Sequence, residues 1–521
     1  MMSDLDRIKN ALSVNPCDAS SYADLGDYYL DDNIDRAFLC YEQARFYERS
    51  SEKKQALTEK MEALRQQGAS VRNVSIVIAS YNSKDAQIGC IESIRMNVPV
   101  GSYEIVVVDN ASTDGIAEWL EQQDDIKLIR NKENAGFGPA SNQGVGIAAA
   151  DNDIFFLNND TIILPNSIFR LRMGLYRDGK TGATGSVSNS VSFYQRVDEP
   201  IDTPEGWMEY GIKNNARTDD PYESVISLVG FALLVKRDVL DKTGLFDEIY
   251  GIGNFEDDDL CMRIRKAGYD CVLCHDSFIY HFGSMGFKQK GADEFNKLIS
   301  TNRKHFVDKW GFDITSYKAP GMDILEHIDE DKNAEFSVLE IGCGCGATLL
   351  KTVYEYPHAK IKGVEENRAI TDVLSSTVDI ETRDRDRLFD LGNERYDYII
   401  LGDITGQIEN IADVLMSMSN NLTEKGCFIL RLYNPIHVSV LLPMLRGHFD
   451  HGRKHFYTVD SIADICKRAN LTIRKLTGTR GYEEAADSEQ EIWEYLSDKL
   501  GEDFTTQALT YNYVISVTGN R

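Results

Sequence analysis

The stretch VSIVIASYN, residues 74–82, is an apolar run that ends in polar residues. Two later runs share this form: EIVVVDNAS at residues 104–112 and IFFLNNDT at residues 154–161. Short apolar runs rich in β-branched residues are typical of buried strands in a parallel sheet. Between the first two runs, isoleucines recur at helical spacing between residues 88 and 94. This alternation predicts an α/β domain whose ligand lies beyond the carboxyl ends of its strands.

Length and charge limit the classes of function that the chain can have. At about 150 residues per domain, the 521 residues suggest about three domains. A formal net charge of -27 argues against binding to nucleic acid or to anionic membranes, which both require a basic surface. The chain starts without a signal peptide pattern and has no apolar run long enough to span a membrane. We therefore expect a cytoplasmic protein with no integral membrane segment, in which the ten cysteines are reduced thiols.

One cysteine pattern requires separate consideration. Cys271, Cys274 and His275 form C-x-x-C-H, the pattern to which haem c is attached. The surrounding residues alternate as in a strand, and haem attachment normally requires export. We interpret the pattern as part of a buried strand.

The pattern of apolar residues changes twice along the sequence, which predicts three segments. Residues 1–70 have helical spacing, and their small and large residues, such as Gly26 and Tyr41, match one tetratricopeptide-like helix pair. Such a pair either binds a partner or only packs against the next domain, and the sequence leaves both alternatives open. Residues 71–315 form the first α/β domain, and residues 316–521 form a second α/β domain of Rossmann-like type.

Two acidic features of the first α/β domain are candidates for chemistry. Asp160 follows a buried strand in LNNDT, where a carboxylate could bind Mg²⁺ or Mn²⁺, although the same residues form good turns. The run Glu256 to Asp259 precedes an amphipathic helix, whose dipole stabilises carboxylates there. Four adjacent acids exceed what a helix cap needs, and their repulsion should raise one pKa, which suits a general base. Farther along the chain, His281 could complete a metal site, and Lys288 and Lys290 could contact a diphosphate, although such residues are often structural.

Together these segments resemble the family 2 glycosyltransferases of the GT-A fold, in particular the bacterial branch for rhamnosyl and protein glycosyl transfer. The resemblance runs from about Asn73 to Trp310. It rests on ordered segments that include IVIASYN, IVVVDNASTDG, RNKENAGFGPASNQGV, FFLNNDT, GFALLVKRDVLDKTGLFDE, NFEDDDLCMRIRKAGY and HFGS.

The resemblance implies a role for each matching residue. The residues implied to bind the nucleotide-sugar donor are Ser80, Tyr81, Asn82, Asp109, Asn134, Gly136, Phe137 and Asn142, to which we add Lys288 as the candidate for the diphosphate. Asp160 would hold Mn²⁺ or Mg²⁺, His281 would either bind the same metal or contact the diphosphate, and Asp257 would be the catalytic base of an inverting transfer. The chain departs from the family at Asn158, where the metal motif usually has its first acid.

The second α/β domain carries a glycine-rich turn between a strand and a helix. Gly342, Gly344 and Gly346 lie in LEIGCGCGAT, and Glu365 ends the next strand, where an acid can bind a ribose. The region from about Asp323 to Thr518 resembles the class I S-adenosylmethionine-dependent methyltransferases. The residues after the acid of the fourth strand depart from that family's usual pattern. Either the domain binds S-adenosylmethionine, or it is a degenerate domain retained for packing or acceptor binding.

The full set of features predicts a glycosyltransferase with a nucleotide-sugar donor. Our first hypothesis is transfer of N-acetylglucosamine from UDP-N-acetylglucosamine to Ser or Thr of a protein acceptor such as flagellin. A rhamnosyltransferase or another enzyme of cell-surface polysaccharide assembly is the second hypothesis. An inactive scaffold is the third.

Overall fold

The computed structural model describes residues 4–216, 221–283, 292–448, 455–480 and 490–519. The chain divides into two compact units, Met1–Lys318 and Ala319–Arg521. Both are α/β, as the sequence predicts. The segment predicted as residues 1–70 belongs to the first unit. None of the described helices is both long and apolar enough to cross a lipid bilayer.

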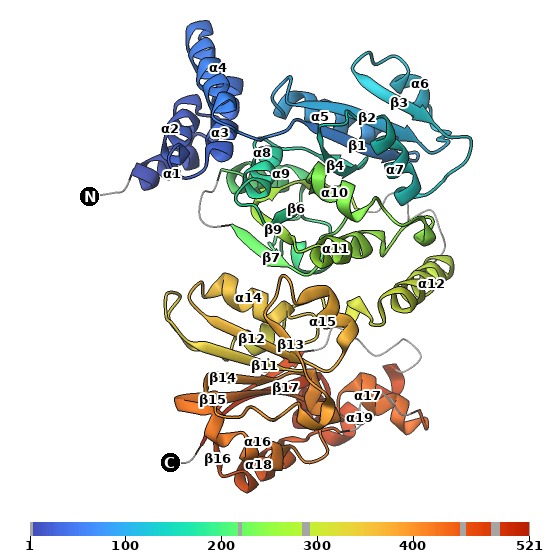
Figure 1. Cartoon of the computed structure of the whole chain (residues 1–521). Helices are drawn as coiled ribbons and strands as arrows, with labels where there is room; N and C mark the ends of the chain where they lie inside the picture. Colours follow the sequence, from blue (N-terminus) through green and yellow to red (C-terminus); the bar gives the residue numbers. More distant parts are fainter. Residues whose placement is uncertain (1–3, 217–220, 284–291, 449–454, 481–489, 520–521) are drawn as a thin grey trace. The chain divides into compact units, whose positions relative to one another are not determined.

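Four helices begin the first unit and lie beside α8 (Figure 1). They are α1 (Asp4–Val14), α2 (Ala19–Tyr29), α3 (Ile34–Tyr47) and α4 (Ser51–Gln66). Gly26 of α2 faces the ring of Tyr41, and a Cβ there would lie 2.5 Å from that ring. The small and large residues of the predicted helix pair therefore pack against each other.

Polar contacts fix these helices to α8 (Ser167–Leu175) and to the turn before it. Arg172 of α8 forms a buried ion pair with Glu42 of α3. Asn166, the N-cap residue of α8, accepts hydrogen bonds from Gln43 at 2.9 Å and from Tyr47 at 2.8 Å. Because a buried ion pair is costly to break, this face of the helical segment is committed to packing.

A mixed eight-stranded sheet forms the centre of the first unit. Its strands, in spatial order, are β3 (Ile126–Arg130), β2 (Tyr103–Asp109), β1 (Val74–Ser80), β4 (Asp153–Asn158), β8 (Ala232–Val235), β6 (Thr181–Val187), β9 (Asp270–Phe278) and β7 (Tyr222–Val225). The first four strands are parallel, so their carboxyl ends meet at one edge. A small antiparallel pair lies apart from this sheet: β5 (Thr161–Ile162) and β10 (Tyr280–His281).

Further helices complete the unit. They are α5 (Lys84–Asn97), α6 (Ile116–Leu120), α7 (Phe137–Ile147), α9 (Pro204–Asn214), α10 (Arg237–Thr243), α11 (Glu256–Lys266) and α12 (Ala292–Trp310). Cys271 and Cys274 are buried in β9 as free thiols, and His275 Nε2 lies 2.7 Å from Glu223. The C-x-x-C-H pattern is therefore part of a buried strand, as predicted.

The second unit has a seven-stranded sheet with five parallel strands and an antiparallel edge. Its order is β13 (Ile380–Thr382), β12 (Lys360–Glu365), β11 (Ser337–Ile341), β14 (Tyr396–Leu401), β15 (Leu422–Tyr433), β17 (Thr510–Gly519) and β16 (Leu471–Arg480). Its helices are α13 (Met322–Leu325), α14 (Ala347–Glu355), α15 (Arg368–Leu374), α16 (Ile411–Ser417), α17 (Val438–Leu445), α18 (Val459–Arg468), α19 (Gln490–Leu500) and α20 (Glu502–Ala508).

Candidate active site

A cavity of about 700 Å³ lies in the first unit. Its lining combines segments that are far apart in the sequence and includes Phe137, Asn158, Gly230, Asp257, His281 and Lys318. This volume is typical of sites that hold a cofactor or a nucleotide-sized ligand. The predicted base and one predicted metal ligand therefore face a common cavity.

Asp257 lies in the first turn of α11 with both carboxylate oxygens hydrogen-bonded. Its Oδ2 accepts from the backbone N–H of Gly230 at 2.8 Å, and its Oδ1 accepts from that of Asp258 at 2.9 Å. Burial raises the pKa of Asp257 to about 6, and the charge of Asp258 adds to this effect, whereas Lys318 opposes it. Repulsion within the acidic run does raise this pKa, as predicted, but burial is the larger cause. The carboxylate is ionised at neutral pH and still basic enough to accept a proton.

The other three acids of the run have different environments. Asp258 accepts a hydrogen bond from Ser227 at 2.7 Å and pairs with Lys318 at 2.8 Å, and both partners of that ion pair are buried. Glu256 is buried, and this burial, together with Asp257, raises its pKa well above the usual range.

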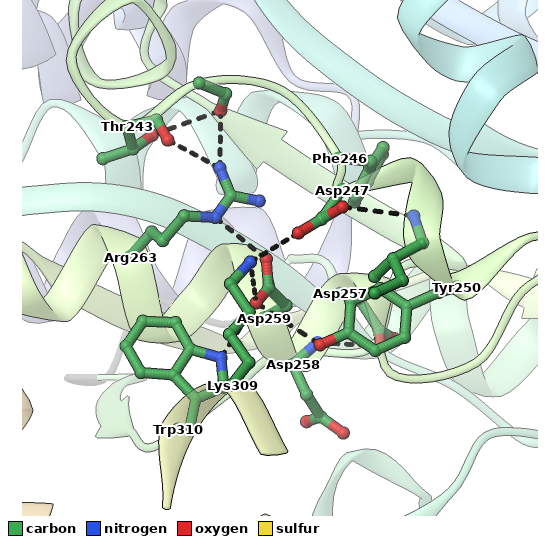
Figure 2. Close-up of polar contacts among 12 residues, drawn as sticks. Thr243, Phe246, Asp247, Tyr250, Asp257, Asp258, Asp259, Arg263, Lys309 and Trp310 are labelled. Carbon is green, nitrogen blue, oxygen red and sulfur yellow. Dashed lines mark hydrogen bonds and ion pairs between the residues drawn. The ribbon is translucent and has the colours of Figure 1, made fainter. Parts of the chain in front are cut away.

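Asp259 is fully buried in a polar cluster (Figure 2). It accepts from Arg263 at 2.9 Å and from the indole N–H of Trp310 at 2.8 Å, and it pairs with Lys309 at 2.7 Å. These contacts tie α12 to the first turn of α11. The run is therefore neither a simple cap nor four equivalent acids.

Asp160 and His281 meet because β5 pairs with β10. His281 lies opposite Thr161, the residue after Asp160, and its Nε2 is 3.1 Å from Asp160 Oδ1. The ring stacks on Phe231 at a centroid distance of 5.3 Å, and both polar side chains are buried. The predicted metal ligands are thus adjacent, although they are 121 residues apart in the sequence.

The surroundings of His281 suit a metal ligand. Its Nδ1 lies 2.5 Å from the carbonyl of Ser190, which can only accept, so Nδ1 carries the proton and donates. In the neutral ring this leaves the lone pair of Nε2 pointing toward the Asp160 carboxylate, a pairing that a cation between them would stabilise. Among the described residues, no three or more histidine, cysteine or carboxylate side chains surround one point. A cation held by Asp160 and His281 would therefore complete its coordination with substrate oxygens and water, as Mg²⁺ commonly does.

Four of the predicted donor-binding residues lie at the carboxyl ends of β1 and β2. Ser80 and Asp109 are register partners on these strands. Asn82 has a left-handed backbone with φ 56°, and its side-chain oxygen accepts from the N–H of Thr113 at 3.0 Å. Tyr81 is the exposed member of the group, with 37% of its surface accessible.

This group continues toward the predicted metal site. Ala79 of β1 pairs with Asn158 of β4, and Asn159 donates to the carbonyl of Asn82 at 3.2 Å. The strand ends thus form one continuous polar edge beside the cavity.

The other predicted donor-binding residues, apart from Lys288, lie in α7 and in the loop before it. Phe137 lines the cavity, and Gly136, with φ 97°, has no room for a side chain because a Cβ would lie 2.2 Å from the carbonyl oxygen of Gly251. Asn134 accepts from the N–H of Gly136 at 2.9 Å and so shapes this loop. Asn142 exchanges two hydrogen bonds with the backbone of Phe246, so the structure gives its amide a supporting role. Lys288 and Lys290 lie outside the described residues.

Sequence reasoning missed three contributors to this cavity. Lys318 lies 60 residues from Asp258 in a segment without a recognisable pattern, two residues past the predicted domain boundary. The N–H of Gly230 and the carbonyl of Ser190 are backbone groups, and the sequence carries no signal for where such groups point. Gly230 does lie in GFALLVKR, one of the segments that support the resemblance.

The glycine turn of the second unit adopts the backbone that its glycines permit. Gly342, Gly344 and Gly346 have φ values of 69°, 53° and 77°, which are costly for other residues. The N–H of Gly344 donates to Glu365 at 2.8 Å, so this acid lies directly against the turn.

A second acid, Glu340, lies near this turn. Glu340 is buried in β11, two residues before Gly342, and its Oε2 has no hydrogen-bond partner among the described residues. Burial raises the pKa of Glu340 to about 8. In its ionised form, Glu340 would fit a ligand that brings a donor or a cation, as the amino group of S-adenosylmethionine would, and a cation there would favour that ionised form.

Comparisons with known proteins match two regions of the chain. Residues 75–244 match the glycosyl transferase family 2 model, and residues 309–476 match a methyltransferase domain model. The chain therefore contains a family 2 glycosyltransferase domain followed by a methyltransferase domain.

Curated relatives match parts of the chain. The uncharacterized glycosyltransferase YfnE of Bacillus subtilis is 37% identical over 251 residues, which cover 40% of this chain and 64% of YfnE. The succinoglycan biosynthesis protein ExoO of Rhizobium meliloti is 36% identical over 121 residues, which cover 23% of this chain and 33% of ExoO. The chain thus spans less than two thirds of the length of either relative.

Among solved structures, the mannosyltransferase PcManGT from Pyrobaculum calidifontis, in complex with GDP-Man and Mn²⁺, is 18% identical. The match has a TM-score of 0.33 and covers 55% of this chain and 77% of that protein.

Proposed function

We propose that the chain is an inverting glycosyltransferase that acts in the cavity lined by Asp257 and His281. One observation carries this proposal: Asp257 and His281, from different segments, line the same cavity. The pKa of Asp257 is raised, and His281 contacts the buried Asp160. Perturbed carboxylates in a cavity are characteristic of catalytic sites.

The proposed reaction is a single in-line displacement. Asp257 accepts the proton of the acceptor hydroxyl while that oxygen forms a bond to the anomeric carbon of the donor sugar. The bond from this carbon to the phosphate oxygen breaks, and the nucleoside diphosphate leaves with the electron pair. The hydrogen bonds from Gly230 and Asp258 orient the carboxylate for this transfer.

Asp160 and His281 are the residues that would hold Mn²⁺ or Mg²⁺, which supplies positive charge against the leaving diphosphate. Ser80, Asn82 and Asp109 would contact the nucleoside from the adjoining strand ends. Phe137 and the loop at Asn134 and Gly136 would shape the donor pocket.

For the acceptor, we place a hydroxyl of a cell-surface glycan first. ExoO, a relative of the glycosyltransferase domain, is named for succinoglycan biosynthesis. The helical segment, which motivated a protein acceptor, uses one face to pack on α8 through the Arg172–Glu42 pair. Transfer of N-acetylglucosamine to Ser or Thr of a protein such as flagellin is the second candidate, since the other faces of these helices stay exposed.

Donor hydrolysis tests the proposal directly. The full chain is incubated with UDP-N-acetylglucosamine, UDP-glucose or dTDP-rhamnose, with Mn²⁺, with Mg²⁺ or with EDTA. We expect release of nucleoside diphosphate from one donor, and we expect EDTA to abolish it. Equal and negligible release from all donors, with binding of none, would show that the site is an inactive scaffold. Flagellin and a surface polysaccharide are then offered as acceptors with the donor that turns over.

For the second unit, we propose that S-adenosylmethionine binds at the glycine turn. Glu365 would contact the ribose, and Glu340 would face the amino group of the cofactor. When bound, the cofactor supplies a methyl group for transfer. The support is the unpartnered Glu340 oxygen, and titration calorimetry with S-adenosylmethionine tests it.

A further inference from the structure

A second cavity, of about 550 Å³, lies between the N-terminal helices and the β7–β9 edge of the first unit. The helices contribute Tyr28, Tyr29 and Arg36, and the rest of the unit contributes Arg170 and Asp276. Its lining shares no residue with that of the candidate active site. Neither the base nor the metal ligands explain it.

Basic side chains are concentrated here in a strongly acidic chain. The lining contains four basic and three acidic residues: Lys9, Arg36, Arg170, Arg177, Asp32, Asp178 and Asp276. The local formal charge is therefore positive by one, whereas the whole chain carries -27. One negative charge from a ligand would balance this cavity.

Arg36 is the basic residue best placed to receive that charge. Arg177 pairs with Asp178 at 3.0 Å, and Arg170 lies 3.5 Å from Asp276. The guanidinium of Arg36 lies over the ring of Tyr29, 4.2 Å from its centroid, and its Nη2 donates to the hydroxyl of Tyr222 at 3.3 Å, but no carboxylate pairs with it among the described residues. Its Nε is buried without a hydrogen-bond partner in the same part of the chain. A guanidinium in this state matches the two oxygens of a carboxylate.

Asp276, in the same cavity, needs hydrogen-bond donors. Only 1% of its surface is exposed, and neither carboxylate oxygen has a hydrogen-bond partner among the described residues. Nη2 of Arg170, a side chain that is 3% exposed, is also without a partner there. Buried polar groups are costly when unsatisfied, so a ligand with hydroxyl groups would relieve this cost.

Aromatic side chains form the remaining wall. The rings of Tyr28 and Tyr29 lie 5.2 Å apart in an edge arrangement, and 48% of Tyr28 is exposed. Such rings offer apolar faces with a polar tip, which suits a ligand that has both C–H faces and hydroxyls.

We propose that this cavity binds a hexuronic acid unit of a glycan, with its carboxylate on Arg36, its hydroxyls toward Asp276 and its C–H face on Tyr28. A bare anion lacks the hydroxyls and a neutral sugar lacks the charge, so neither meets all three demands. The binding itself does not depend on catalysis. A role in holding an acidic acceptor rests on the proposed glycosyl transfer.

Saturation-transfer NMR on the full chain tests this proposal with D-glucuronate, D-glucose and acetate as separate probes. We expect transfer to the ring protons of D-glucuronate, with little competition from D-glucose or acetate. Arg36→Met keeps the apolar packing but removes the charged donors, so glucuronate affinity should fall about tenfold or more. Arg45→Met, on the same helix α3 and outside the cavity lining, should bind like the wild type.

A second variant covers the case in which Arg36→Met fails to fold. Tyr28 is half exposed, so Tyr28→Ala should remain folded and still weaken glucuronate binding. Absence of glucuronate binding to the wild type would overturn the proposal, as would equally strong binding of acetate or undiminished binding to both variants. Donor hydrolysis, measured on the same samples, reports on the other cavity, so failure here leaves the proposed transfer unaffected.

Discussion

The two α/β units use their acids in opposite ways. In the first unit, Asp257 faces an open cavity of about 700 Å³, and its hydrogen bonds come from backbone N–H groups. In the second unit, the acids at the strand ends are largely engaged by the chain itself. Arg431 pairs there with both Asp323 and Asp403, and Glu365 accepts from Gly344 and Asn367.

This difference teaches that the position of an acid at a strand end does not by itself indicate catalysis. Glu256 and Asp257 both combine burial, a neighbouring negative charge and a cavity in front of them, and Asp257 differs in that two backbone N–H groups hold its carboxylate. The same distinction holds within the acidic run, where Asp259 points into a cluster of cations (Figure 2).

The largest effect is expected from Asp257→Asn. The amide keeps the shape of the side chain but cannot take a proton, so transfer should fall about 10²–10⁴-fold. Donor binding should be nearly unchanged, because the base acts on the acceptor. Steady-state transfer rates and calorimetric donor affinity measure the two quantities. Transfer at the wild-type rate would exclude Asp257 as the base.

Asp259→Asn sharpens the contrast, because it changes an acid two residues away. This variant removes the buried anion beside Arg263 and Lys309, although Lys309 keeps its pair with Asp247, so the free energy of unfolding should fall by about 1.5–3 kcal/mol. Denaturant unfolding followed by fluorescence measures the loss. A variant as stable as the wild type but inactive would instead place Asp259 in the chemistry.

The second unit is expected to respond more weakly, through Glu365→Gln. If Glu365 holds the ribose of S-adenosylmethionine, loss of its charge should weaken calorimetric binding about tenfold. Asp403→Asn is the matched control, since that acid is 57% exposed and pairs with Arg431. Equal affinity in wild type and Glu365→Gln would indicate that Glu365 only shapes the glycine turn.

The sequence predicted much of this arrangement, for identifiable reasons. Apolar runs that end in Ser80, Asp109 and Asn158 identify strand ends, because burial imposes the composition of a strand. The four adjacent acids were conspicuous in the same way. The local pattern alone does not tell which of the four acids is the base, and the resemblance supplied the choice of Asp257. Residues brought together by packing, such as Lys318, leave no local pattern.

Asn142 shows what a motif match leaves out. The resemblance assigned it to the donor pocket, but its amide is occupied by the backbone of Phe246. The motif gives the position of the residue in the chain, whereas its hydrogen bonds are made with a residue 104 positions away, which the motif does not reveal.

The smallest effect concerns Lys318, and it tests how the cavity sets the pKa of the base. Because transfer requires ionised Asp257, the wild-type rate should rise with pH through about 6 and then level off. The positive charge of Lys318 lowers this pKa, so Lys318→Met should move the rising limb to higher pH, by about one unit or less. The rate profile is measured well below the melting temperature, since the variant leaves Asp258 unpaired in a buried site.

A double variant separates charge from packing. In Asp258→Asn with Lys318→Met, a neutral pair replaces an ion pair that was neutral overall, and Ser227 can still donate to the side chain at position 258. The rising limb should therefore return toward the wild-type pH, although the cavity has lost the same lysine. A limb that stays displaced in the double variant would mean that Lys318 acts by positioning α11. An unchanged limb in the single variant would mean that Asp257 does not control the rate.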